Sequence, residues 1–158
     1  MAGFSALGTI LVFSTTLSGY AATSSGYVVG LTNISGPTMS AEEIDVSSHD
    51  STGAYREYVT GFLDAGEFSI EGNITGTTGV TSSKNVAEFM AGFNSRLAHN
   101  CIVIFPGTDR LSWKFHGYIT GVETNAPYDD KASFSATIRV SGGTTGTPVL
   151  STSTSTGA

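Results

Sequence analysis

The chain has 158 residues, a length typical of one domain, and only 13% of its residues are charged. The formal net charge of −6 argues against binding nucleic acid through clustered lysine and arginine side chains. A single cysteine, Cys101, excludes an intrachain disulfide. Gly, Ser and Thr replace charged residues, which favours either a β-rich protein with many turns or a surface largely covered by partners.

Three segments in the first half of the chain have the composition of β-strands. Residues 7–13 and 26–33 are rich in β-branched and aromatic residues, with Ser, Thr and Gly between them. In residues 66–74 apolar side chains alternate with polar and acidic ones, which predicts a strand with one buried and one acidic face. No Lys or Arg precedes Arg56, so we interpret residues 7–13 as a strand rather than a signal peptide. No segment approaches the roughly 20 apolar residues of a membrane span.

A polar and acidic segment, residues 35–60, separates the second of these strands from the third. Its middle has no clear hydrophobic period, so we expect a long loop, and such loops are usually functional or disordered. Eight acidic residues lie between Glu42 and Glu71, opposed there only by Arg56, whereas the other six basic residues all come later. This asymmetry indicates either a solvated acidic loop or head-to-tail complementarity between identical subunits.

The hydrophobic period becomes helical over residues 85–98. The spacing of Asn85 and Glu88 is typical of a helix N-terminus, and Asn100 predicts its end. Gly92 weakens the helix slightly. The apolar residues form one stripe, which we expect to pack on a sheet: Val86, Phe89, Met90, Phe93 and Leu97.

Three strands are predicted after the helix. Residues 101–105 are apolar throughout, and we interpret Cys101 within them as a small buried hydrophobe rather than a reactive thiol. Residues 112–124 and 132–140 alternate between apolar and polar side chains. The pattern predicts a mainly β protein: a two-sheet antiparallel β-sandwich or barrel with one flanking helix over residues 1–140. Residues 141–158 form a Ser/Thr/Gly-rich C-terminal extension that cannot build a core of its own.

No group of residues predicts catalysis, a cofactor or a metal. His49, His99 and His116 are scattered, and His99 with Cys101 gives too few ligands for zinc. The acidic residues near Glu42 lack the pattern of an EF-hand loop. A phosphate-binding glycine loop with lysine and a nucleophile elbow are both absent from the sequence. We therefore expect a protein that is not an enzyme.

Three neighbouring segments resemble the signature of major tail tube proteins of long-tailed, non-contractile bacteriophages. They are ISGPTMSAEEIDVSSHDSTG at residues 34–53, YREYV at 55–59 and GFLDAGEF at 61–68. Ser47 and Tyr58 depart mildly from the signature, because they stand where the family more often has Thr and Phe. The remainder of the chain agrees with the family only in its layout of strands, one helix and further strands.

The resemblance implies a structural virion protein with a β-sandwich fold. Six copies would form a ring, and stacked rings would form the tail tube, through which double-stranded DNA passes without specific binding. It also implies tape-measure, tail-tip and tail-terminator proteins as partners, no membrane, and synthesis in the cytoplasm of a bacterial host. The loop at residues 35–60 would be an assembly arm that becomes ordered against neighbouring copies.

Two sets of residues follow from this interpretation. The expected inter-subunit contacts are Ile44, Asp45, Asp50, Tyr55, Arg56, Glu57, Tyr58 and Asp64. Tyr55, Arg56 and Tyr58 are the expected anchors, since aromatic residues and Arg dominate interface energetics, with packing against the chain's own sandwich as the alternative. Glu71 is the first carboxylate expected in the lumen, followed by Glu67, Glu123 and Asp129.

Two other classes of β-sandwich protein remain open. One is a secreted sugar-binding or adhesin module, which would more often show clustered exposed aromatic residues and a signal peptide. The other is a head–tail joining or tail-terminator protein, which would form a single ring and would not polymerise.

Overall fold

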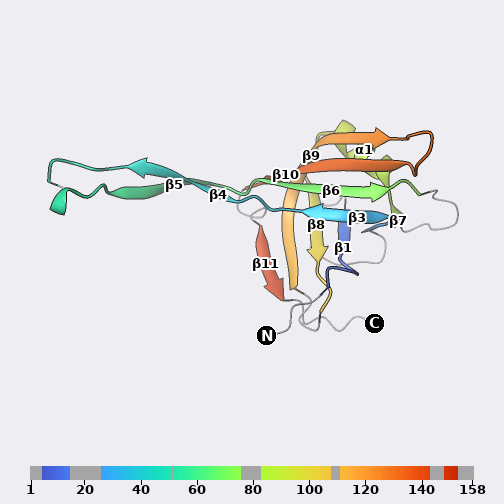
Figure 1. Cartoon of the computed structure of the whole chain (residues 1–158), viewed down its shortest axis with the longest axis horizontal. Coiled ribbons are helices and arrows are strands. Elements are labelled where there is room, and N and C mark those ends of the chain that lie inside the picture. The colour runs from blue at the N-terminus through green and yellow to red at the C-terminus, as the bar shows by residue number, and fades with distance from the viewer. Residues whose placement is uncertain are drawn as a thin grey trace.

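The computed structural model describes residues 5–14, 26–50, 52–75, 83–107, 111–142 and 148–152. It consists of a β-sandwich body and a long hairpin that projects from it (Figure 1). The elements in chain order are β1 (Ile10–Ser14), β2 (Tyr27–Val28), β3 (Leu31–Ser35), β4 (Ser40–Asp45), the 3-10 turn Thr52–Ala54, β5 (Tyr58–Asp64), β6 (Glu67–Asn73), β7 (Ser83–Lys84), α1 (Val86–Ser95), β8 (His99–Ile104), β9 (Leu111–Asn125), β10 (Ser133–Ser141) and β11 (Val149–Thr152).

The body is built from one sheet of nine strands that folds over on itself. Its strand order is β3-β6-β10-β9-β8-β1-β2-β7, and β11 also pairs with β9. The 15-residue strand β9 serves both layers, because its first half pairs with β8 and its second half with β10. A register shift between Thr137 and Ile138 interrupts the pairing with β10, and such bulges let strands bend. The predicted antiparallel β-sandwich with one flanking helix is confirmed; only β2 and β7, among the described strands, pair in parallel.

Aromatic rings fill the space between the two layers. Phe68 of β6 stacks on Phe115 of β9 with the ring centroids 4.3 Å apart. Phe89 of α1 contacts Phe13 of β1 at 5.0 Å and Phe134 of β10 at 5.9 Å. All five rings are buried, so α1 closes the sandwich by inserting one ring between a strand of each layer.

The strongly alternating segments form the predicted strands. In β10 the apolar residues predicted to face the core are buried: Phe134, Ala136, Ile138 and Val140. The segment predicted as one strand at 26–33 is instead divided into β2 and β3 at Gly30. Gly30 has a φ of +77°, and a Cβ there would lie 2.6 Å from the Asn73 carbonyl oxygen.

The C-terminal extension contributes a strand that the sequence did not predict. Residues 149–152 form β11, which pairs antiparallel with residues 111–114 of β9. This short strand adds to an existing sheet edge, so it needs no core of its own. The domain boundary at residue 140 stays a prediction.

The expectation of a loop over residues 35–60 is wrong for much of that segment. Strands β4 and β5 pair antiparallel from Ser40 opposite Asp64 to Asp45 opposite Tyr58. Nearly every side chain of both strands is exposed, so no buried face imposes a hydrophobic period of two. A register shift between Ala41 and Glu43 further interrupts the alternation.

Helix α1 begins where predicted and ends earlier. The side-chain oxygen of Asn85 accepts a hydrogen bond from the Val86 N–H, which makes Asn85 the N-cap. The C-cap is Arg96, in the left-handed conformation with a φ of 57°, rather than the predicted Asn100. No helix within the described residues is long and apolar enough to cross a membrane.

The apolar stripe of α1 does not pack on the chain's own sheet as a whole, which corrects the prediction. Phe89 is fully buried, whereas Met90, Phe93 and Leu97 are 43%, 44% and 63% exposed. Helix α1 instead approaches β9 closely at Gly92, where a Cβ would lie 2.6 Å from Cδ1 of Ile119. In the sequence, Gly92 was interpreted only as a residue that weakens the helix. In the structure, its lack of a side chain allows α1 to pack closely on β9.

Candidate functional site

The hairpin of residues 40–64, hereafter the arm, projects from the body of the molecule (Figure 1). Its described side chains are exposed, and Gly61 is half-buried. A two-stranded hairpin alone is only marginally stable in water, and exposed apolar clusters mark interaction sites. The large apolar residues exposed along the arm are Ile44, Val46, Tyr55, Tyr58, Val59, Phe62 and Leu63.

Polar contacts hold the end of the arm together. The Asp45 carboxylate accepts a hydrogen bond from the Ser47 N–H at 2.9 Å, and the Ser47 hydroxyl accepts one from the Glu57 N–H at 2.9 Å. The Ser47 side chain, and then its N–H, lower the pKa of Asp45 below its ordinary value. Arg56 lies 3.5 Å from the Asp45 carboxylate, but both side chains are largely exposed, so this ion pair adds little stability.

Charged contacts and one glycine fix the base of the arm to the sandwich. Arg139 of β10 contacts the carboxylates of Asp64 at 2.6 Å and Glu67 at 3.4 Å. The other Asp64 oxygen accepts a hydrogen bond from the Gly66 N–H at 2.9 Å. Gly66 has a φ of +71°, and a Cβ there would lie 2.0 Å from the Thr38 carbonyl oxygen, so no other residue fits.

The residues predicted to contact other subunits all lie on the arm. Tyr55 and Tyr58 are 79% and 54% exposed, which argues against the alternative that they pack on the sandwich. Asp64 is engaged within the chain by Arg139. The sequence interpretation missed Phe62 and Leu63, which are 87% and 77% exposed; their signal was an apolar pair within an otherwise polar segment.

A second exposed surface is the polar face of strands β3, β6, β10 and β9. The pairing register places Glu71, Ser135 and Glu123 in one row across three of these strands. Asn33 of β3 extends the row, with its side-chain nitrogen 3.5 Å from a Glu71 carboxylate oxygen. Two carboxylates distant in the sequence are thereby separated by a single serine.

The other two predicted lumen carboxylates are placed differently. Glu67 lies on the same face near its edge, opposite Arg139 in register. Asp129 lies outside the sheet, in the turn between β9 and β10. Ser69 and Thr137 form the row next to that of Glu67, and both have short polar side chains. In the row of Glu67 itself, Arg139 lies between Glu67 and Tyr118.

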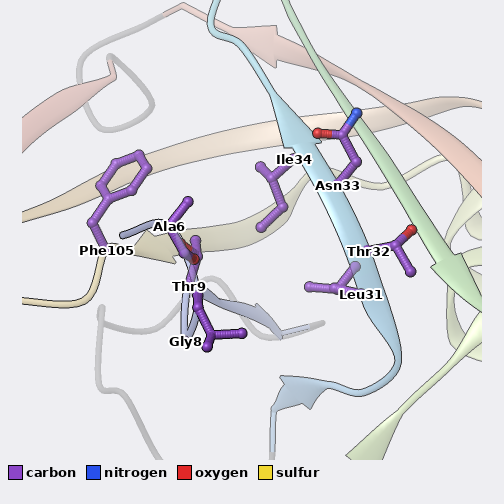
Figure 2. Close-up of a pocket in the computed structure, with 9 residues that line it drawn as sticks. Ala6, Gly8, Thr9, Leu31, Thr32, Asn33, Ile34 and Phe105 are labelled. Atoms are coloured by element: carbon purple, nitrogen blue, oxygen red, sulfur yellow. The ribbon is translucent and has the colours of Figure 1, made fainter. Parts of the chain in front are cut away.

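A groove of about 390 Å³ opens beside the edge strand β3. Figure 2 shows Leu31 and Ile34 of β3 on one side of it, facing Phe105 and the segment of residues 6–9. Among the described residues no titratable side chain lines this groove, and the lining offers apolar contacts with hydroxyl and amide groups.

Among the described residues, His99 and Cys101 are buried side chains with potential for chemistry. Burial raises the pKa of the Cys101 thiol far above its ordinary value, which confirms that this residue is an inert buried hydrophobe. His99 is 2% exposed and packs 4.8 Å from the Phe13 ring. Among the described residues, no group of three or more His, Cys, Asp or Glu side chains is placed to hold a metal ion.

Burial should make the fold sensitive to mild acid through His99. Desolvation lowers its pKa below 6.5, so the unfolded chain takes up a proton more readily than the folded chain. The free energy of unfolding should therefore fall as the pH drops below about 6.5, and should be constant above it. Urea denaturation between pH 5.5 and 7.5 tests this expectation. His99→Gln should flatten the profile, whereas His49→Gln, on the exposed arm, should retain it.

No protein-family model matches the sequence, and no curated protein matches it. Solved structures of a virion, a tail tube and a contractile injection system do match. A chain from the virion of a native gene transfer agent particle is 20% identical with a TM-score of 0.59, and the match covers 90% of this chain and 95% of that one. The SPP1 tail tube chain is 12% identical with a TM-score of 0.60, covering 94% and 78%. A sheath/tube terminator chain of the contractile injection system PVC is 10% identical with a TM-score of 0.65, covering 95% and 97%. This chain therefore has the tail-tube fold that its sequence predicted.

Proposed function

We propose that this chain is a structural virion protein that polymerises into the tube of a phage tail and has no catalytic activity. The observation that carries the proposal is the arm, an exposed apolar hairpin on a tail-tube fold. Such a surface needs a partner, and the simplest partner is another copy of the chain. The tail of an empty gene transfer agent particle, whose chain covers 90% of this one, was solved with C6 symmetry, which supports six copies in each ring.

In this proposal the polar face of β3, β6, β10 and β9 lines the lumen. Glu71 and Glu123, with Glu67 at the edge and Asp129 in the adjacent turn, repel the phosphates of passing double-stranded DNA, so the DNA slides without binding. The predicted contact residues of the arm, together with Phe62 and Leu63, join subunits. Tape-measure, tail-tip and tail-terminator proteins are the further partners, and the protein is made in the host cytoplasm before it enters the virion tail.

A tail-terminator role is the second candidate, because the fold also matches a sheath/tube terminator with a TM-score of 0.65. Negative-stain electron microscopy across a concentration series, with and without salt, separates the two. Long hollow tubes with a regular axial repeat are expected. Single closed rings at every concentration would favour the terminator, and monomers at every concentration would show that the chain does not polymerise without an initiator.

Reversing the charge of the central row should make tubes retain DNA. In the double variant Glu71→Lys and Glu123→Lys each subunit gains two cations where it had two anions, so phosphates are attracted rather than repelled. Short double-stranded DNA should co-sediment with variant tubes at low salt and dissociate as salt rises, and should not co-sediment with wild-type tubes.

The matched control is the double variant Glu71→Gln and Glu123→Gln, which removes the anions without adding cations. Its tubes should bind far less DNA than the lysine variant. Equal DNA retention by wild-type and lysine-variant tubes would show that DNA does not reach this face in the tube, which contradicts its assignment to the lumen.

A further inference from the structure

We propose that the arm of one copy docks on an apolar patch at the C-terminal end of α1 in a second copy. The proposal rests on the tail-tube function above and names the receiving surface. The patch consists of Met90, Phe93, Arg96 and Leu97 with Tyr118 of β9.

The patch is exposed and hollowed. Phe93 and Tyr118 are 44% and 43% exposed, and Leu97 is 63% exposed. Phe93, Arg96 and Tyr118, with two neighbouring residues, line a hollow of about 360 Å³. The fold of the isolated chain leaves these apolar groups in water, because α1 reaches its own core mainly through Phe89 and Gly92.

Arg96 adds a cation at a position that favours glycine. Its φ of 57° is left-handed, a conformation that is unfavourable for a residue with a Cβ and that helix C-termini usually assign to Gly. Strained residues of this kind concentrate at functional sites. Among the described residues the Arg96 guanidinium pairs with no carboxylate, whereas Arg56 and Arg139 both do.

The arm carries the complementary features. Phe62 and Leu63 are exposed apolar residues on opposite faces of β5. The exposed carboxylate of Glu43, paired with Thr60, lies on the Phe62 face, and that of Glu42, beside Gly61, lies on the Leu63 face. An acidic apolar surface matches a basic apolar one in both respects. The described residues that line the groove beside β3 carry no charge, so they offer the arm no such match.

The contact must join different copies. Figure 1 shows the arm pointing away from the body, with α1 on the body beside β9 and β10, so an arm cannot fold back onto its own patch. A contact between two different surfaces of identical chains is heterologous, and it propagates into closed rings or open polymers. This geometry is the one that a stacked tube requires.

Cross-linking of full-length chains tests the docking. Thr60→Cys places a thiol on the arm, and Asn94→Cys places one in the lining of the hollow while keeping the apolar and basic residues of the patch. The native Cys101 is buried and should not react with a thiol cross-linker. A short bismaleimide added to a mixture of the two variants should give an arm-to-patch dimer. Ser69→Cys on the polar face, mixed with Thr60→Cys, should not.

Arg96→Gly in the Asn94→Cys chain separates docking from folding. Glycine suits the left-handed C-cap, so the melting temperature should hold or rise while the cross-linked yield falls at least tenfold. Arg96→Lys should retain most of the yield. An unchanged yield with Arg96→Gly, or no arm-to-patch product at all, would overturn the docking. Hollow tubes without that product would leave the tube function intact, and the product without tubes would contradict the function alone.

Discussion

Replacing Phe62 and Leu63 together with serine will abolish assembly and leave the sandwich folded. The two side chains are 87% and 77% exposed on β5, so the isolated fold gains little from them. Burying each against another copy is worth about 1.5–3 kcal/mol, and losing both weakens every contact by about two to four orders of magnitude. Sedimentation velocity and electron microscopy measure assembly, and circular dichroism measures the melting temperature.

Tyr128 provides the control for that double variant. It is fully exposed in the turn between β9 and β10, away from the arm, and Tyr128→Ser should assemble as the wild type does. Normal tube growth by the Phe62/Leu63 variant would exclude the arm as an assembly surface. A large fall in its melting temperature would instead assign those residues to folding.

Phe115→Ala should lower the free energy of unfolding by about 3–5 kcal/mol. The Phe115 ring is fully buried and stacks on Phe68 across the two layers of the sandwich, so its removal leaves a cavity between them. Domains of this size are stabilised by only about 5–15 kcal/mol, which makes this loss a large share of the total. Urea denaturation at a concentration where the chain is monomeric measures it.

Phe62→Ala is the matched control, because it removes the same side chain from an exposed position. Its effect on the free energy of unfolding should stay within about 0.5 kcal/mol. Comparable losses in the two variants would mean that the arm is coupled to the core, contrary to its exposure.

The sequence predicts an element well where water and core impose different side chains on its two faces. Strand β10 is such a case, since its apolar residues face the core and its polar residues face outward. The arm escaped prediction because both of its faces are exposed and a register shift breaks the alternation. A hydrophobic period arises where one face of an element is buried in the chain's own core. A strand that is instead proposed to be covered by other copies therefore shows no such period.

The sequence indicated which residues form the candidate sites, but it indicated less well where those residues lie in the fold. The apolar stripe of α1 was visible in the sequence, but periodicity does not tell whether the chain's own sheet or another molecule covers it. The row that joins Glu71 to Glu123 depends on the pairing register of β6, β10 and β9. Register arises from packing and turns distributed over the whole sheet, and it cannot be read from either glutamate.

Because the base of the arm is held against the sandwich, a small change in the angle at the base moves the far end of the arm by a larger distance. The seven residues of β5 span roughly 23 Å, so a tilt of about 5° where the hairpin leaves the body moves its far end by about 2 Å. Gly66, held against the Thr38 carbonyl, and the Arg139 contacts to Asp64 and Glu67 set that angle. In a filament built through the arm as proposed, substitutions at Gly66 or Arg139, which are not among the predicted contact residues, would therefore change the twist and rise.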